Sequence, residues 1–327
     1  MFAGYPSFCI PIIVAFVLIG TGIVYHEFAL NGFSIGRTSS LESSTDFHYK
    51  YRYSTFGVRK SNWLNSLYNS NNKDSYSMKE SDGYFDESDG HWNLRKMRAY
   101  DQSFKQVMDH EKRGTLFFQN NWEPDFSCTL EERLGETGDG GKWICDVGRI
   151  QLKDKCIVYS IGSHNEFSFE EDIKIRLPNC EIHSFDPTVS EHMHAPSFIT
   201  FHRIGLANKK GLLNIAGKDY PVDTLQGIKK MLNHTDHEID ILKIDIEGSE
   251  YLIDPIVYSD AKARLLLLEV HPQKPSIIHD LFLKLRNNAY AIYHKEPNIA
   301  YLMNNKRDVA VEYAFVRLSN QFWKPVS

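Results

Sequence analysis

The residues best suited to chemistry stand in two pairs, each separated by one residue: Asp245 with Glu247, and Glu269 with His271. Each pair stands at the end of an apolar run rich in isoleucine or leucine. Side chains two positions apart on an extended chain point to the same face, so each pair can act on one ligand. A carboxylate or an imidazole so placed can orient or deprotonate a hydroxyl group. Asp245, Glu247 and His271 are therefore the predicted catalytic residues.

The same four side chains also have the chemistry of a divalent metal site, because carboxylate oxygens and imidazole nitrogens are common metal ligands. A structural role would explain them as well. Glu247 and Glu269 could cap helices or pair with Lys243 and Lys295, and acid clusters arise in proteins without any ligand. The sequence leaves the metal interpretation and the structural interpretation open.

These residues lie in a regular alternation of strand-like and helix-like segments. Short β-branched or apolar runs predict strands over 156–162, 181–186, 198–204, 239–244, 264–272, 290–293 and 310–318. Helices are predicted over 169–177, with Ser168 as N-cap, and over 277–285. Such alternation is typical of a doubly wound α/β sheet, in which ligands bind beyond the carboxyl ends of the strands.

The first two predicted strands end in residues that suit a nucleoside. Gly162 allows close approach of the backbone, and Asp186 can accept hydrogen bonds from the two hydroxyls of a ribose. A turn glycine and a helix-capping aspartate would explain the two positions equally well. The full Gly-x-Gly-x-x-Gly pattern of dinucleotide enzymes is absent. A cofactor with one nucleoside and no pyrophosphate, such as S-adenosylmethionine, asks less of the loop.

A glycine-rich segment, 135–143, precedes the first strand but is not a phosphate loop. Glu136 stands where the first glycine belongs, and Trp143 replaces the required Ser or Thr. We interpret the segment as a plain glycine-rich loop. Apolar residues at near-helical spacing predict one further helix over 94–112, packed against the core.

The N-terminal part of the chain differs in composition from the rest. Residues 8–24 form an apolar run that, with its uncharged flanks, approaches the roughly 20 residues needed to cross a bilayer. We interpret residues 1–30 as a transmembrane signal-anchor; a cleaved signal peptide followed by secretion is the alternative. Residues 31–90 are rich in Ser, Asn, Asp and Gly and predict a low-complexity stem. The folded domain is then 91–327.

Cysteine usage favours a lumenal domain in the secretory pathway, in the ER or Golgi. A glycosylation sequon at Asn233 agrees with that location. Four cysteines follow the apolar run, and four allow three pairings. Cys156 and Cys180 stand at the starts of two strands that should be parallel neighbours. This predicts a Cys156–Cys180 bridge, with Cys128–Cys145 as the other.

Two further observations argue against additional ligands. The net charge is −5, so the chain lacks the basic field that would hold a nucleic acid. His192, His194 and His202 lie near one another in the sequence, but no acid or cysteine completes a ligand set at fixed spacing. We interpret these three as surface histidines.

Several motifs resemble those of FkbM-type S-adenosylmethionine-dependent methyltransferases, and more closely the methyltransferase-like 24 group of that superfamily. The resemblance covers about residues 94–318. It rests on the segment 239–250 together with Trp122-Glu-Pro, Cys128, Gly138-Asp-Gly-Gly-Lys-Trp-Ile-Cys-Asp146, Val158-Tyr-Ser-Ile-Gly162, Phe167-Ser-Phe-Glu170, His183-Ser-Phe-Asp-Pro187, Gly205-Leu206, Leu268-Glu-Val-His271 and His294-Lys-Glu-Pro-Asn298. It implies a Rossmann-like methyltransferase sheet and S-adenosylmethionine as the cofactor.

This resemblance implies a placement for each part of the cofactor. We expect Gly162 and Ser163 near the methionine part, Asp186 on the ribose and Leu206 near the adenine. Asp245 should face the methyl-donor end. The resemblance implies little about the acceptor; our own hypothesis is O-methylation of a hydroxyl on a small molecule or a glycan.

The loop after Gly162 departs from the methyltransferase pattern. Ser163, His164 and Asn165 stand where the general methyltransferase loop has glycines. This departure keeps a second interpretation open, in which the chain is a non-catalytic binding module that has retained the fold.

Overall fold

The structure is a computed structural model that describes residues 75–105, 115–189, 195–215, 217–299, 301, 303 and 309–324. The predicted signal-anchor and the predicted stem up to residue 74 lie outside the described residues. Within the described ranges, no helix has the length and apolar character needed to cross a membrane.

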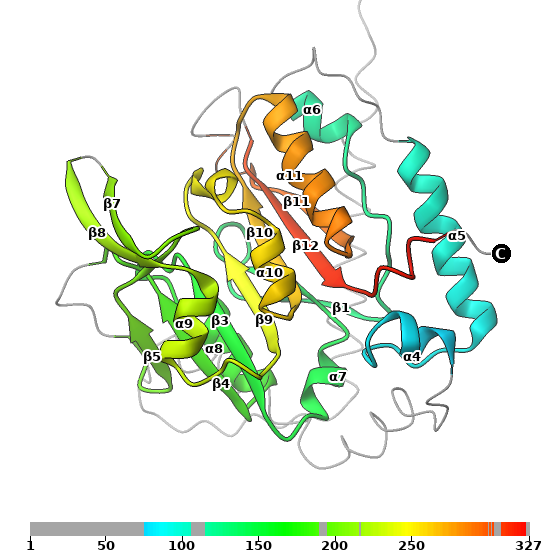
Figure 1. Cartoon of the computed structure of the whole chain (residues 1–327), viewed down its shortest axis with the longest axis horizontal. Coiled ribbons are helices and arrows are strands. Elements are labelled where there is room, and N and C mark those ends of the chain that lie inside the picture. The colour runs from blue at the N-terminus through cyan, green and yellow to red at the C-terminus, as the bar shows by residue number, and fades with distance from the viewer. Residues whose placement is uncertain are drawn as a thin grey trace, which may run out of the picture. The chain divides into compact units, whose positions relative to one another are not determined.

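A seven-stranded sheet forms the centre of the domain, in the order β11-β12-β10-β9-β3-β4-β5 (Figure 1). Its strands are β3 (Cys156–Ile161), β4 (Cys180–Phe185), β5 (Ile199–His202), β9 (Ile239–Ile244), β10 (Ala263–Val270), β11 (Tyr290–Pro297) and β12 (Val311–Arg317). The five strands from β5 to β10 are parallel, and β12 is antiparallel to both of its neighbours. The predicted α/β fold and its seven predicted strands are confirmed.

Helices cover both faces of this sheet, as a doubly wound fold requires (Figure 1). One core contains residues of α9 (Leu225–Met231), α10 (Ile256–Asp260) and α11 (Pro275–Asn287). The other contains residues of α5 (Asp89–Lys105), α7 (Val147–Gln151) and α8 (Ser168–Arg176). Neighbouring residues of β9 alternate between the two cores, Leu242 in the first and Ile241 in the second, because the side-chain period of a strand is two.

The start of α8 differs from the prediction in one detail. Ser168 is the first residue of the helix and not its N-cap, which is Phe167 without a side-chain cap bond. The Ser168 hydroxyl instead accepts a hydrogen bond from the backbone N–H of Glu136, at 3.0 Å. It therefore ties the helix to the glycine-rich segment.

The folded domain begins earlier than composition predicted. The helix α4 (Tyr76–Glu80) lies inside the predicted stem, and the Ser75 hydroxyl caps it by accepting from the N–H of Met78. Tyr84 and Phe85 are buried in the core. Residues 75–90 therefore belong to the domain, because these two aromatic side chains pack there despite their polar neighbours.

The helix α5 buries a different face from the predicted one. Leu94, Met97 and Tyr100 are exposed, at 62%, 57% and 48%. Trp92 and Ala99 are fully buried instead. The described helix ends at Lys105, so the last part of the predicted helix lies outside the described residues.

Several short elements were not predicted. They are β1 (Glu131–Leu134) with β2 (Lys142–Cys145), a small sheet of β6 (Gly205–Leu206), β7 (Gly211–Ile215) and β8 (Lys218–Asp223), the helix α6 (Thr115–Asn120) and the 3₁₀ turn η1 (Ser249–Leu252). The short helices α7, α9 and α10 were not predicted either. The glycine-rich segment is the turn of the antiparallel β1–β2 hairpin. The β7–β8 pair projects from the sheet as a second hairpin (Figure 1).

Both predicted disulfides are present. Cys156 and Cys180 join the starts of β3 and β4, where they are direct partners in the parallel ladder. Cys128 and Cys145 join the segment before β1 to the end of β2. Each bond therefore links elements that already lie side by side.

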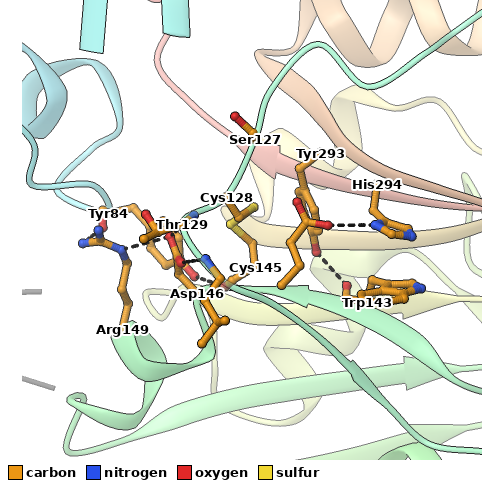
Figure 2. Close-up of a disulfide and its surroundings, with 12 residues drawn as sticks. Tyr84, Ser127, Cys128, Thr129, Trp143, Cys145, Asp146, Arg149, Tyr293 and His294 are labelled. Atoms are coloured by element: carbon orange, nitrogen blue, oxygen red, sulfur yellow. Dashed lines mark hydrogen bonds and ion pairs between the residues drawn. A yellow bond between two sulfur atoms is a disulfide. The ribbon is translucent and has the colours of Figure 1, made fainter. Parts of the chain in front are cut away.

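The Cys128–Cys145 bond lies in a network that holds β2 in place (Figure 2). The Asp146 carboxylate accepts a hydrogen bond from the N–H of Leu130 at 2.7 Å. The Tyr84 hydroxyl donates to the Cys145 carbonyl at 3.0 Å. This network fixes the strand whose first residue, Lys142, reaches the edge of the sheet discussed next.

Candidate active site

The carboxyl ends of β3, β4 and β9 meet at one edge of the sheet. The N–H of Asp245 donates to the Ile161 carbonyl at 2.9 Å, and the N–H of Gly162 donates to the Phe185 carbonyl at 2.8 Å. Gly162 has a φ of +85°, and a Cβ there would lie 1.7 Å from the Asp245 carbonyl oxygen. Glycine is required at this point because any side chain would push β3 and β9 apart.

A cavity of about 780 Å³ opens beyond these strand ends. Its lining includes every predicted cofactor-binding and catalytic residue: Gly162, Ser163, Asp186, Leu206, Asp245, Glu247 and His271. The volume lies within the usual range for a small-molecule site. The structure therefore gathers into one cavity residues that are spread over 110 positions of the sequence (162 to 271).

Two segments without a predicted role also line the cavity. The turn of the β1–β2 hairpin contributes Asp139 and Gly140, and the β7–β8 hairpin contributes Leu213 and Tyr220. The second hairpin had a readable signal, since its turn contains Gly217 between two short strands. The β7–β8 hairpin was nevertheless not predicted.

Asp186 organises the loop that follows β3. Its carboxylate accepts hydrogen bonds from the N–H of His164 at 3.0 Å, and from the N–H and hydroxyl of Thr188 at 2.9 and 2.6 Å. A carboxylate offers about four acceptor positions, so one is left for a ribose hydroxyl. Nearby on the cavity wall, the hydroxyl of Ser163 is buried without a hydrogen-bond partner among the described residues. A polar ligand would satisfy it.

Asp245 lies between two buried ammonium groups. Lys142 Nζ is 3.5 Å from its Oδ2, and Lys243 Nζ is 4.0 Å from the same oxygen. Burial alone would raise the pKa of Asp245, but the two ammonium groups together hold that pKa well below its usual range. Asp245 is therefore ionised. It can accept a hydrogen bond from a substrate, although its low pKa makes it a weak base.

Glu269 is the neutral partner of Asp245. Burial raises the pKa of Glu269 well above its usual range, and the charges of Glu312 and Asp245 act in the same direction. Its Oε1 accepts a hydrogen bond from the Asn298 side chain at 3.1 Å. The carboxyl groups of Glu269 and Asp245 are hydrogen-bonded to each other and share one proton. The site therefore holds Asp245 as the anion and Glu269 as the acid.

His271 lies between two glutamates. Its Nε2 is 3.3 Å from Glu247 Oε2, and its Nδ1 is 3.3 Å from Glu250 Oε1. Burial alone would lower the pKa of His271, but the hydrogen bonds and charges of Glu247 and Glu250 raise it to about 10. His271 is thus a cation at neutral pH. This charge state argues against the predicted role as a general base and favours a role as a hydrogen-bond donor.

The structure regroups the residues of the metal hypothesis. The ligand atoms of Asp245, Glu247 and His271 lie within 4.8 Å of one another. Glu269 belongs instead to a separate group with Asp139 and one further buried glutamate. The predicted set of four is therefore corrected to three.

Lys142 and Lys243 are the site residues that the sequence analysis missed or misplaced. Lys142 is 103 positions from Asp245 in the sequence, and nothing local indicates their contact. Lys243 was a suggested partner for the glutamates but approaches Asp245 instead. Lys295, the other suggested partner, pairs with Glu123. Lys243 lies on β9, two residues before Asp245, whereas only the packing of β2 against the sheet brings Lys142 to Asp245.

The interpretation of His202 as a surface histidine is wrong. His202 is half-buried, and its Nε2 lies 2.9 Å from Nδ1 of His183 on the neighbouring strand β4. Burial, together with the charge of His183, lowers the pKa of His202 to about 4. His192 and His194 lie outside the described residues.

Comparison with known proteins agrees with this fold and site. A family model described as "Methyltransferase domain" matches residues 75–317. The human protein "Probable methyltransferase-like protein 24" is 27% identical over 131 residues, which cover 38% of this chain and 35% of that protein. The rat protein of the same name is also 27% identical over 131 residues, and 36% of it is covered.

The matched region is thus about a third of the length of these relatives. No solved structure matches the chain. The family match, by contrast, extends from α4 to the last residue of β12 and includes every strand that borders the cavity. The predicted resemblance is confirmed, and the chain belongs to the methyltransferase-domain family.

Proposed function

We propose that this chain is an S-adenosylmethionine-dependent methyltransferase that acts on a hydroxyl group of a small molecule or a glycan. The observation that carries the proposal is the convergence of Gly162, Asp186 and Asp245 on one cavity. They follow three adjacent parallel strands, β3, β4 and β9. Doubly wound α/β sheets bind nucleotide-containing ligands at such a place.

The cavity wall suits the parts of this cofactor. Asp186 would accept from a ribose hydroxyl, the free hydroxyl of Ser163 would contact the polar methionine part, and the buried Leu206 would pack against the adenine. When bound, the cofactor supplies an electrophilic methyl group on a positively charged sulfonium. Ionised Asp245 provides a favourable field for that cation.

The acceptor would bind on the side of Asp245 and His271. Asp245 accepts a hydrogen bond from the acceptor hydroxyl and thereby aims its oxygen at the methyl group. As the new C–O bond forms, the hydroxyl oxygen becomes positively charged and its proton passes to Asp245. The ligand oxygens of Asp245 and Glu247 lie within 4.8 Å of each other, so the proton can move on to Glu247, whose side chain is 81% exposed, and from there to water. Cationic His271 donates from Nε2 to a second oxygen of the acceptor once the exposed side chain of Glu247, its partner at that nitrogen, moves aside. A polyol or a sugar offers such a neighbouring oxygen.

A labelling screen tests this function directly. Full-length protein is incubated with methyl-labelled S-adenosylmethionine and fractions of secretory-pathway lysate. We expect transfer by the wild type and by Asp280→Asn, a matched change at an exposed acid remote from the cavity. We expect roughly hundredfold slower transfer by Asp245→Asn, measured at saturating cofactor because the lost charge also weakens binding of the sulfonium cation.

The possible outcomes separate the two interpretations of the chain. Equal transfer by wild type and Asp245→Asn would contradict the role of Asp245. Cofactor binding without transfer to any fraction would favour the non-catalytic binding module. Absence of cofactor binding would refute the proposal altogether.

We also propose that the domain lies in the lumen of the secretory pathway, anchored through residues 8–24. Two disulfides support this location, because such bonds persist in oxidising compartments. Expression with microsomes tests it. We expect a mass shift on endoglycosidase treatment that disappears in Asn233→Gln. An unglycosylated protein that added protease digests would place the domain on the cytosolic side.

A further inference from the structure

A second cluster of ligand-type side chains lies away from the candidate active site. Glu181 and His183 are on β4, and His234 is in the loop between α9 and β9. None of the three lines the cavity at the strand ends. They gather at the amino-terminal part of β4, whereas the cavity opens beyond its carboxyl end.

The ligand atoms of this cluster have the spacing of a metal site. His183 Nε2 lies 2.9 Å from Glu181 Oε1, and His234 Nε2 lies 3.5 Å from the same oxygen. The three ligand atoms are all within 4.8 Å of one another. Ligands about 2.0–2.2 Å from a tetrahedral zinc ion are separated by about 3.3–3.5 Å. Small side-chain rotations would therefore bring all three into coordination.

The other nitrogen of each imidazole ring is already held. His183 Nδ1 lies 2.9 Å from His202 Nε2, and His234 Nδ1 lies 2.8 Å from the Tyr159 hydroxyl. Both ligand rings are nearly buried, at 3% and 7% exposure. Metal-binding histidines are characteristically fixed in this way, by a partner on the nitrogen that does not bind the ion. The contacts at the two Nδ1 atoms thus hold both rings with Nε2 toward the Glu181 carboxylate, which is the arrangement that an ion requires.

We propose that Glu181, His183 and His234 bind a zinc ion. Two imidazoles with one carboxylate are a typical zinc ligand set, whereas calcium and magnesium prefer oxygen ligands alone. The side chain of Glu181 is 57% exposed, so water can occupy the fourth position. The ion fastens the loop before β9 to β4, next to the Cys156–Cys180 bond. The ion takes no part in methyl transfer, because none of its three ligands lines the cavity.

Zinc binding by the purified full-length chain tests this site. After metal removal, the protein is titrated with zinc, and bound zinc is measured by elemental analysis together with the melting temperature. We expect one zinc per chain at this site and a rise in Tm of about 5–10 °C at 100-fold excess over Kd. We expect at least tenfold weaker binding in His234→Gln and in Glu181→Gln. The second variant changes an exposed side chain, so the protein should remain folded.

Two further variants make the result specific. His237→Gln is the matched control, because the ring of His237 lies 6.0 Å from that of His234 but does not belong to the ligand group. We expect it to bind zinc as the wild type does. His271→Gln, in the cavity, should also retain this zinc. Equal zinc affinity in the wild type and both ligand variants, loss of zinc only in His271→Gln, or no zinc binding by the wild type would each overturn the proposal.

Discussion

Replacing Asp186 by asparagine should weaken S-adenosylmethionine binding while preserving shape. The carboxylate accepts from the N–H of His164 at 3.0 Å and from two donors of Thr188 at 2.9 and 2.6 Å. An asparagine can keep the two Thr188 bonds through its single oxygen. Its amide NH₂ group would then face the N–H of His164, where only an acceptor fits, and could offer the ribose hydroxyl only a neutral hydrogen bond in place of a charged one.

The size of this effect follows from the bonds that are lost. A hydrogen bond to a charged group contributes about 1.5–3 kcal/mol. A neutral hydrogen bond contributes about 0.5–1.5 kcal/mol, so exchanging the charged ribose bond for a neutral one costs about 1–1.5 kcal/mol and Kd should rise by roughly 5–13-fold. The hydrogen bond from His164 is lost in the free variant as well as in the complex. Its loss therefore raises Kd only to the extent that cofactor binding requires the ordered loop after β3.

Calorimetry with S-adenosylmethionine on Asp186→Asn measures this change. Thr188→Val is the matched control, since it removes one donor to the same carboxylate but leaves the charge and its free acceptor position. We expect the control to bind within about threefold of the wild type, less than the loss of one charged hydrogen bond. An unchanged Kd in Asp186→Asn would refute the ribose role of Asp186.

Three further outcomes are expected. Gly162→Ala should lower the free energy of unfolding in urea by roughly 2 kcal/mol or more, because of the left-handed φ and overpacking, and should abolish cofactor binding. Gly211→Ala, with nothing within 4 Å of its added Cβ, should have little effect. Similar losses of stability in both variants would contradict the steric argument. Because the pKa of His271 is raised in the fold to about 10, its charged contacts stabilise fully below the unfolded pKa near 6.5 and less as pH rises toward 10. The destabilisation caused by His271→Gln should therefore shrink over that pH range, and a pH-independent difference would argue against a cationic His271. Replacing Cys156 and Cys180, 24 residues apart, by serine should lower the unfolding free energy by about 3 kcal/mol, and an unchanged urea midpoint in the double variant under oxidising conditions would show that the bond adds no stability.

Local patterns were sufficient to predict the sheet. The strand over 239–244 was readable because its residues are apolar and β-branched, and such a run favours an extended buried conformation wherever it occurs. The Cys156–Cys180 bond was readable for a related reason. Consecutive parallel strands in a doubly wound fold lie side by side, so residues at their starts meet.

The same local reasoning failed where a few side chains outweighed composition. The segment 75–90 is rich in Ser, Asp and Gly, yet Tyr84 and Phe85 bury it in the core. In α5, the apolar stripe that includes Leu94 faces outward, and Trp92 determines the buried face. A large aromatic side chain buries about 150–250 Å² of surface, so the fully buried Trp92 determines which face of the helix packs on the core.

The sequence by itself determined the seven strands of the central sheet, the helices α5, α8 and α11 and the residues that follow each strand, because these depend on neighbours within a few positions of the chain. It therefore identified Gly162, Asp186 and Asp245 as members of one site. Only the tertiary structure decided the charge state of Asp245, because its pKa depends on Lys142, which is 103 positions away in the sequence. The same holds for the cluster of Glu181 with His234, whose members come from separate elements. Electrostatic interactions act through space, and one sequence does not specify which distant charges become neighbours.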